Sequence, residues 1–102
     1  MRLVLSTEAA ASLEHQVSWV RGAISPASAD RLRERVLKFL AGHLLAFPRT
    51  GHELGQRELW EIWIPGTRLV VWYRLSADEV QVAAVWHASQ DRWSVDDTMN
   101  DD

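Results

Sequence analysis

The sequence contains no cysteine, and it also lacks any long apolar run. Without cysteine there is no disulfide framework and no thiolate metal site, which suits a reducing compartment. No apolar run approaches the length of a membrane span, and the apolar part of MRLVLSTEAA is too short for a signal peptide. We therefore expect a soluble, cytoplasmic protein that does not contact a membrane.

Basic residues are too few for a generic nucleic-acid binder. The 102 residues include eleven Lys and Arg against fourteen Asp and Glu, a net charge of −3. Four of those acids lie in the end segment DDTMNDD, so residues 1–95 hold eleven bases and ten acids, a balance of +1. Phosphate binding normally needs an excess of cations on one face. We expect a single domain over residues 1–95 and an acidic, flexible tail over residues 96–102.

Apolar residues recur at helical spacing in the first half of the chain. The spacing predicts a helix over 8–21, capped by Ser6 or Thr7. Ser25–Pro26 suits the cap and first position of a second helix, which we expect to run from about 26 to 46. The short linker between them predicts an antiparallel helical hairpin.

Beyond Pro48 the apolar period changes from helical spacing to alternation. Alternating segments at 57–64, 68–75 and 80–87 are separated by tight turns, which predicts an antiparallel meander of three strands. With a first strand at 2–6, the order of elements is β-α-α-β-β-β. We predict an α+β fold in which an antiparallel sheet is packed on one face by the helical hairpin.

Alternation also sorts the side chains of the three strands onto two faces of the sheet. One face is almost wholly apolar, includes Tyr73 and Trp86, and is predicted to pack on the helices. The other face is mixed and is predicted to be open to solvent. It carries Arg57, Glu61, Trp63, Arg68, Trp72, Arg74 and His87. Large aromatic side chains beside arginines on an uncovered face indicate a binding surface.

A series of landmarks follows in order along the second half of the chain. The stretch LLAFPRTGHELGQRELWEIWIPGTRLVVWYRL holds Phe47–Pro48–x–x–Gly51, a strand starting at Arg57–Glu58, and a Gly-Thr-Arg turn into a strand ending in Tyr73–Arg74. The stretch VQVAAVWHASQDR then ends a last strand in His87, with Gln90 and Arg92 after it. This ordered set resembles the RelE/ParE superfamily, the toxin components of bacterial type II toxin–antitoxin modules.

The resemblance implies partners and an activity that composition does not reveal. Such toxins are held inactive by a cognate antitoxin whose C-terminal segment wraps around them. The expected assembly is a toxin–antitoxin hetero-oligomer that binds operator DNA only through the antitoxin, in a module of the plasmid-stabilization kind. RelE-like members cleave mRNA on the ribosome, whereas ParE-like members inhibit DNA gyrase.

A RelE-like nuclease would need a defined set of side chains. Metal-independent RNA cleavage requires a base, cations for the developing phosphorane charge, and an acid for the leaving oxygen. The predicted set is Glu61 or Glu58 as base, Arg57, Arg68 and Arg74 as cations, and His87 as acid. Some RelE-like members place an arginine and a histidine where Arg68 and His87 stand. Others use a lysine-rich cluster and a C-terminal tyrosine, but here the only lysine is Lys38 and no tyrosine follows Tyr73.

Three hypotheses follow. The first is a ParE-like toxin that acts by binding gyrase and is not an enzyme. The second is a RelE-like endoribonuclease, and the third is a non-toxic relative that binds only an antitoxin. Antitoxin or target binding is predicted at Trp63, Trp72, Arg68, Arg74, His87 and Arg92. The chain suggests no cofactor and no metal, because the spacing of His15, His43 and His52 forms no ligand pattern.

A plainer interpretation of His87 also stays open. A histidine at the end of a strand commonly has a structural role, here capping the following turn through a backbone hydrogen bond. The basic segment RLRERVLK of the second helix is likewise interpreted as a solvated helix face with i,i+3 and i,i+4 ion pairs.

Overall fold

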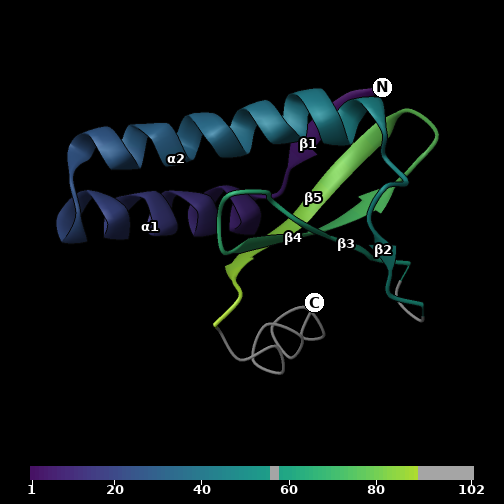
Figure 1. Ribbon diagram of the computed structural model, residues 1–102. Coiled ribbons are helices and arrows are strands. Elements are labelled where there is room, and N and C mark those ends of the chain that lie inside the picture. Colours follow the sequence, from purple (N-terminus) through teal and green to yellow (C-terminus); the bar gives the residue numbers. More distant parts are fainter. Residues whose placement is uncertain (56–57, 90–102) are drawn as a thin grey trace.

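The computed structural model describes residues 1–55 and 58–89 of the chain. Two helices and a π-helical segment follow a first strand, and four further strands complete the fold (Figure 1). The elements are β1 (Arg2–Leu5), α1 (Thr7–Ala23), α2 (Pro26–Lys38), η1 (Phe39–Leu44), β2 (His52–Glu53), β3 (Trp60–Trp63), β4 (Leu69–Leu75) and β5 (Glu79–His87). The α+β class predicted from the sequence is confirmed.

Both α-helices begin at serine caps. The Ser6 hydroxyl accepts a hydrogen bond from the Ala9 N–H at 3.0 Å, and Ser25 accepts one from the Ser28 N–H at 3.1 Å. Pro26 occupies the first turn of α2, where its missing N–H has no helical partner to lose. Beyond Lys38 the second helix continues through η1, a π-helical segment that the sequence pattern did not predict.

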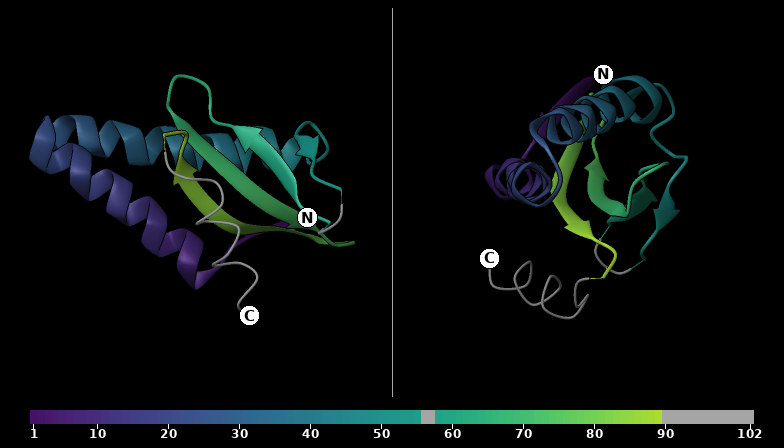
Figure 2. Two further views of the ribbon diagram at one scale, coloured as in Figure 1. Left: turned by 90° about the horizontal axis from the view of Figure 1, so that it is seen from below. Right: turned by 60° about the vertical axis from the view of Figure 1, so that its left-hand side comes forward.

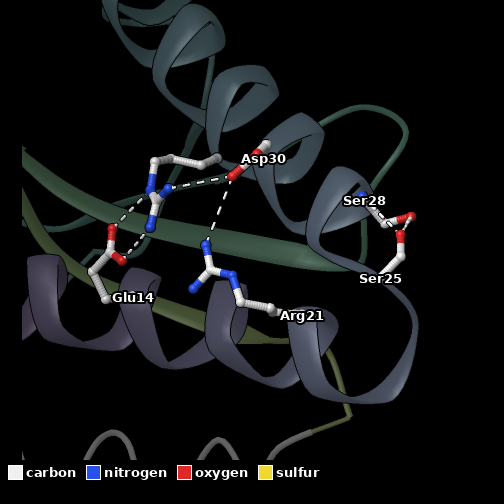
Figure 3. A network of polar contacts seen from close by, with 6 residues as sticks. Glu14, Arg21, Ser25, Ser28 and Asp30 are labelled. Atoms are coloured by element: carbon white, nitrogen blue, oxygen red, sulfur yellow. Dashed lines mark hydrogen bonds and ion pairs between the residues drawn. The ribbon is translucent and has the colours of Figure 1, made fainter.

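The two helices form an antiparallel hairpin on one side of the sheet, and its α1–α2 turn extends past the strands (Figures 1 and 2). Polar side chains join the helices on their outer side (Figure 3). Arg33 donates to both carboxylate oxygens of Glu14, at 3.0 and 2.6 Å. This hydrogen bond from Arg33 holds the pKa of Glu14 below its usual value. Asp30 lies 3.8 Å from Arg33 and 3.7 Å from Arg21.

None of the helices in the described parts of the chain is long and apolar enough to span a membrane.

The sequence predicted an antiparallel sheet, but the sheet is mixed, with one parallel pair of strands. Its strand order is β1-β5-β4-β3-β2, with β1 parallel to β5 and the other neighbours antiparallel. The parallel pair sets Arg2 opposite Glu79, far apart in the sequence. Local alternation identifies strands but does not determine which distant strand lies alongside, so this pairing was not predictable from the pattern.

The strand predicted over 57–64 is shorter than expected, and the short strand β2 precedes it. β3 covers only Trp60–Trp63 of the predicted 57–64, and Arg57 lies outside the described residues. Glu58 has a φ of 55°, a left-handed conformation that cannot continue a strand. The chain reverses there, so β2 pairs with β3 and His52 lies opposite Glu61.

A β-bulge in β5 changes which side chains face the helices. Tyr73 of β4 pairs with Val82, but its neighbour Trp72 pairs with Ala84, so Ala83 is an extra residue. An extra residue reverses the alternation beyond it. Val80 and Val82 face the helices as predicted, but after the bulge Val85 does so instead of Ala84 and Trp86.

The predicted faces of the second half of β5 are therefore exchanged. His87 lies opposite Leu69, a residue of the helix-packed core, and so is on the helix side of the sheet. Trp86 lies opposite Val70 on the other side, which we call the far face. The far face carries Glu61, Trp63, Val70, Trp72, Arg74 and Trp86.

The far face is not bare, which corrects a second expectation. Leu59, Val70, Trp72 and Trp86 form a buried cluster, with Leu54 packed against it. Trp72 and Trp86 meet edge to face, with ring centroids 5.6 Å apart. Trp72 is only 3% exposed, whereas Trp63 on the same face is 56% exposed.

The Pro48 and Gly51 landmarks are held to the sheet by Tyr73. The Tyr73 hydroxyl donates to the Pro48 carbonyl at 2.8 Å and accepts from the Gly51 N–H at 3.2 Å. A Cβ at Gly51 would overlap that hydroxyl and lie 2.7 Å from the Glu61 carbonyl oxygen. The chain passes so close to the sheet that only glycine fits.

Candidate functional site

A depression lies where the helical hairpin meets the turn between β3 and β4. We call it the hairpin hollow, and its volume is about 380 Å³. It is lined by Gln16, Trp19, Val20, Leu32, Gly66, Thr67, Arg68, Leu69 and His87. Trp19 is the large side chain at its rim, 64% exposed on α1.

Strand pairing brings Arg68 and His87 into this hollow. His87 ends β5 opposite Leu69, and the Ala88 N–H donates to the Arg68 carbonyl at 2.8 Å. Thr67 fixes the approach to β4, because its hydroxyl donates to the Ile64 carbonyl and accepts from the Leu69 N–H. The β5 bulge then decides the side, since without Ala83 the His87 ring would face the far face.

The contacts of His87 define its tautomer. Its Nδ1 accepts the backbone N–H of Ser89 at 3.1 Å and lies 2.7 Å from the Ser89 hydroxyl oxygen. A backbone N–H can only donate, so the neutral imidazole carries its proton on Nε2. This contact is the turn-capping hydrogen bond that the structural interpretation of His87 predicts.

The other residues of the predicted nuclease set lie elsewhere. Glu61 is on the far face, where its carboxylate accepts the Trp72 indole N–H at 2.7 Å. Arg74 is also on that face, opposite Gln81. Arg68 and Arg74 are six residues apart along an extended strand, which separates their backbones by ~20 Å. The structure thus brings Arg68 and His87 together but sets Glu61 and Arg74 apart from them.

The predicted binding residues are also divided. Trp63 is exposed on the far face, whereas Trp72 is buried beneath Leu54 and Leu59, because the segment before β3 covers it. Arg92, like Arg57, lies outside the described residues. Within residues 1–55 and 58–89, no three His, Asp or Glu side chains gather closely enough to hold a metal ion.

Sequence reasoning missed the α1 contribution to the hollow. Leu13, Val17 and Val20 mark the core stripe of that helix, and Trp19 lies off it. A large aromatic residue off the apolar stripe of an amphipathic helix has no core to fill, and this was the available signal.

Comparison with known proteins agrees with the fold. No curated protein sequence matches the chain. A solved structure from the chromosomal ParDE TA system of P. aeruginosa is similar, with a TM-score of 0.75 and 17% identity, over 85% of this chain and 95% of that one. The isolated E. coli RelE toxin is similar with a TM-score of 0.54 and 13% identity, over 96% of this chain and 95% of that one. At these identities the two likenesses show the fold alone.

The family itself is shown by sequence. Residues 3–92 match the family described as ParE toxin of type II toxin-antitoxin system, parDE. The match covers nearly the whole chain and confirms the superfamily resemblance drawn from the sequence landmarks and the order of elements. The chain belongs to the ParE toxin family of type II toxin–antitoxin systems.

Proposed function

We propose that the chain inhibits growth in the cytoplasm by binding DNA gyrase, and that a cognate antitoxin neutralises it. The observation that carries this proposal is the division of the predicted nuclease set between two faces of the sheet. Arg68 and His87 line the hairpin hollow, whereas Glu61 and Arg74 lie on the far face.

That division weighs against RNA cleavage by the predicted set. Base, acid and cation must all reach one phosphate and its neighbouring hydroxyl. Glu61 is engaged by the Trp72 indole on the side of the sheet opposite His87. A single substrate in the hairpin hollow would meet His87 and Arg68 without that carboxylate.

The hairpin hollow has instead the composition of a protein-binding surface. Trp and Arg are the side chains that most often dominate binding energy at interfaces. Trp19 is exposed at the rim of the hollow, and Arg68 is exposed beside it. A protein target that inserts against Trp19 would bury a large apolar surface that is now in contact with water.

Supercoiling by purified gyrase in the presence of the purified toxin tests the proposal. We expect inhibition, and Trp19→Ala should weaken it by about 2 kcal/mol or more, a ~30-fold rise in Kd. Trp63→Ala on the far face is the matched control and should leave inhibition unchanged. Undiminished supercoiling, together with codon-phased cuts in mRNA after induction of the toxin, would overturn the proposal.

The RelE-like alternative is supported by one specific feature, the shared position of Arg68 and His87 beside an exposed Trp19 that a base can stack on. It predicts mRNA cleavage that is lost in both His87→Gln and Arg68→Ala, while the fold and antitoxin binding survive. Full toxicity of both variants would exclude this mechanism.

The antitoxin is proposed to lie along the far face at Trp63. Trp63 is the exposed aromatic side chain of that face in the described chain, and Trp72 is too buried to be touched directly. Trp63→Ala should therefore weaken the toxin–antitoxin complex by about 2 kcal/mol if Trp63 anchors it. Titration calorimetry with the antitoxin measures this, and an unchanged Kd would refute the placement.

A further inference from the structure

A second depression lies between the second helix and Pro65 of the β3–β4 turn, and it shares no lining residue with the hairpin hollow. We call it the α2 groove, and its volume is about 550 Å³. It is lined by Arg31, Glu34, Arg35, Lys38, Phe39, Gly42, His43 and Pro65. Arg35 reaches the β3–β4 turn, where its guanidinium lies 3.5 Å from the Pro65 carbonyl oxygen.

An aromatic row continues from this groove along the helix. Phe39 and His43 are stacked with ring centroids 5.1 Å apart, and His43 is 5.5 Å from Phe47. Phe47 is 62% exposed. The row is on and beside η1, and π-helical segments within helices occur frequently at functional sites. The groove thus offers an apolar, ring-lined end and a charged end.

The charged end is basic. Its lining includes three cationic side chains, Arg31, Arg35 and Lys38, and one carboxylate, that of Glu34. An anionic segment with a few apolar side chains is the ligand that such a surface complements, with its acids at the helix cations and its apolar groups at the rings.

The chain itself carries a segment of this chemistry. Residues 90–102 have the sequence QDRWSVDDTMNDD. They contain five aspartates and one arginine, together with Trp93, Val95 and Met99. The rest of the chain has ten bases and nine acids, so the net negative charge is concentrated in this segment.

The segment also begins within reach. Ala88 is hydrogen-bonded to Arg68, at the same β3–β4 turn that Arg35 contacts at Pro65. Thirteen residues in extended form span up to ~43 Å. The stretch of helix from Arg31 to His43 measures only ~18 Å. We infer that residues 90–102 dock in the α2 groove of their own chain, with aspartates at Arg31, Arg35 and Lys38 and apolar side chains against the aromatic row.

The absence of cysteine makes a direct test straightforward. Asn100→Cys introduces a single thiol without altering the charge of the segment, and a nitroxide attached there reports on nearby amides of the full-length chain. We expect the amide signals of Arg35–His43 to be lost in NMR spectra with the oxidised label and restored after its reduction.

Two charge variants and one control establish the cause. Arg31→Glu/Arg35→Glu should restore the α2 signals with the oxidised label. Asp96→Asn/Asp97→Asn should do the same while leaving every residue of α2 unchanged, which covers the case in which the helix variant misfolds. Arg74→Glu on the far face should leave the signal loss as it was.

Other patterns of signal loss would overturn the inference. Loss confined to residues 85–89 means that the segment does not dock. Loss on the far face that Arg74→Glu abolishes places the segment there instead. Loss at α2 that appears when labelled and isotope-enriched chains are mixed identifies a second copy as the occupant. None of these results depends on whether gyrase is the target.

Discussion

The two faces of the sheet are built in different ways. The helix side packs against Leu13, Val17, Val36 and Leu40 of the hairpin, and its Tyr73 hydroxyl is tied to the turn at Pro48. Within residues 1–55 and 58–89 no helix packs on the far face, which is instead built around the indoles of Trp72 and Trp86, with Leu54 and Leu59 packed against them. Trp72 and Tyr73 are adjacent in the sequence and anchor opposite sides. Their junction is also the site of the register shift.

The difference shows how a single residue can change the side of the sheet that a candidate site residue faces. The first half of β5 follows simple alternation, whereas the second half is inverted by Ala83. The inversion sends Trp86 to the far face, where it completes the buried cluster, and sends His87 to the hairpin hollow. The same bulge therefore places Trp86 in the buried cluster of the far face and His87 in the hairpin hollow.

The largest expected effect comes from removing Trp86. Its side chain is 4% exposed and meets Trp72 edge to face, so Trp86→Ala leaves a cavity in a cluster with few members. We expect a loss of about 3–5 kcal/mol in unfolding free energy, measured by urea denaturation. A loss below about 1 kcal/mol would show that the far face, unlike the helix side of the sheet, is not a packed core.

A smaller effect is expected on the helix side from Gly51→Ala. The new methyl group would overlap the Tyr73 hydroxyl and crowd the Glu61 carbonyl, forcing the turn away from the sheet. Overpacking of this kind costs about 1–3 kcal/mol. Gly55→Ala does not make this contact, because nothing lies near its Cβ position, although its φ of +71° adds backbone strain.

The double variant Gly51→Ala/Tyr73→Phe separates the two causes. Removing the hydroxyl makes room for the methyl group, so the double variant should be more stable than the sum of the single losses predicts. Strict additivity of the two losses would show that Gly51 and Tyr73 do not act on each other.

Tyr73 also predicts a dependence on alkaline pH. Burial raises the pKa of its hydroxyl above the ordinary value of 10.0, although the Gly51 N–H acts in the opposite direction. Because the folded chain holds this proton more tightly, the stabilisation is fully present below pH 10.0 and is lost as pH rises through the folded pKa.

Measurement of this effect is simple because Tyr73 is the only tyrosine. In the folded chain its phenolate absorbance should appear at a higher pH than in the unfolded chain. The unfolding free energy of the unsubstituted chain, measured with urea, should fall over the same pH range. Tyr73→Phe should cost about 1 kcal/mol at neutral pH, since two hydrogen bonds to the Pro48–Gly51 turn are lost, and should flatten the alkaline decline. An equally steep decline in Tyr73→Phe would assign it to other groups.

The helices, the hairpin and the three-strand meander were predictable because local signals define them. Ser25–Pro26 begins a helix, and alternation marks β4 and β5. The bulge was not predictable, because Ala83 and Ala84 are small apolar residues that fit either face. The parallel β1–β5 pair and the cover over Trp72 were also missed, because both depend on contacts between distant segments.

The candidate site shows the same division. The sequence placed Arg68 and His87 on one surface, and they do line one hollow, but on the side of the sheet opposite to the expected one. The β4–β5 pairing that brings them together follows from a tight turn and is local. The side they face depends on the register beyond Ala83, and a one-residue change in register reverses every side chain after it.

The smallest effect is expected from Trp63→Ala, and it sharpens the contrast within the far face. Trp63 and Trp72 point to the same side, but Trp63 is 56% exposed and Trp72 is 3% exposed. Truncating Trp63 removes mainly its cross-strand contact with Val70, so the loss in unfolding free energy should be at most about 1 kcal/mol. The same urea measurement that reports several kcal/mol for Trp86→Ala provides the comparison. A loss for Trp63→Ala as large as that for Trp86→Ala would mean that the exposed indole is needed for the fold. The proposal that Trp63 is available to bind an antitoxin would then be wrong.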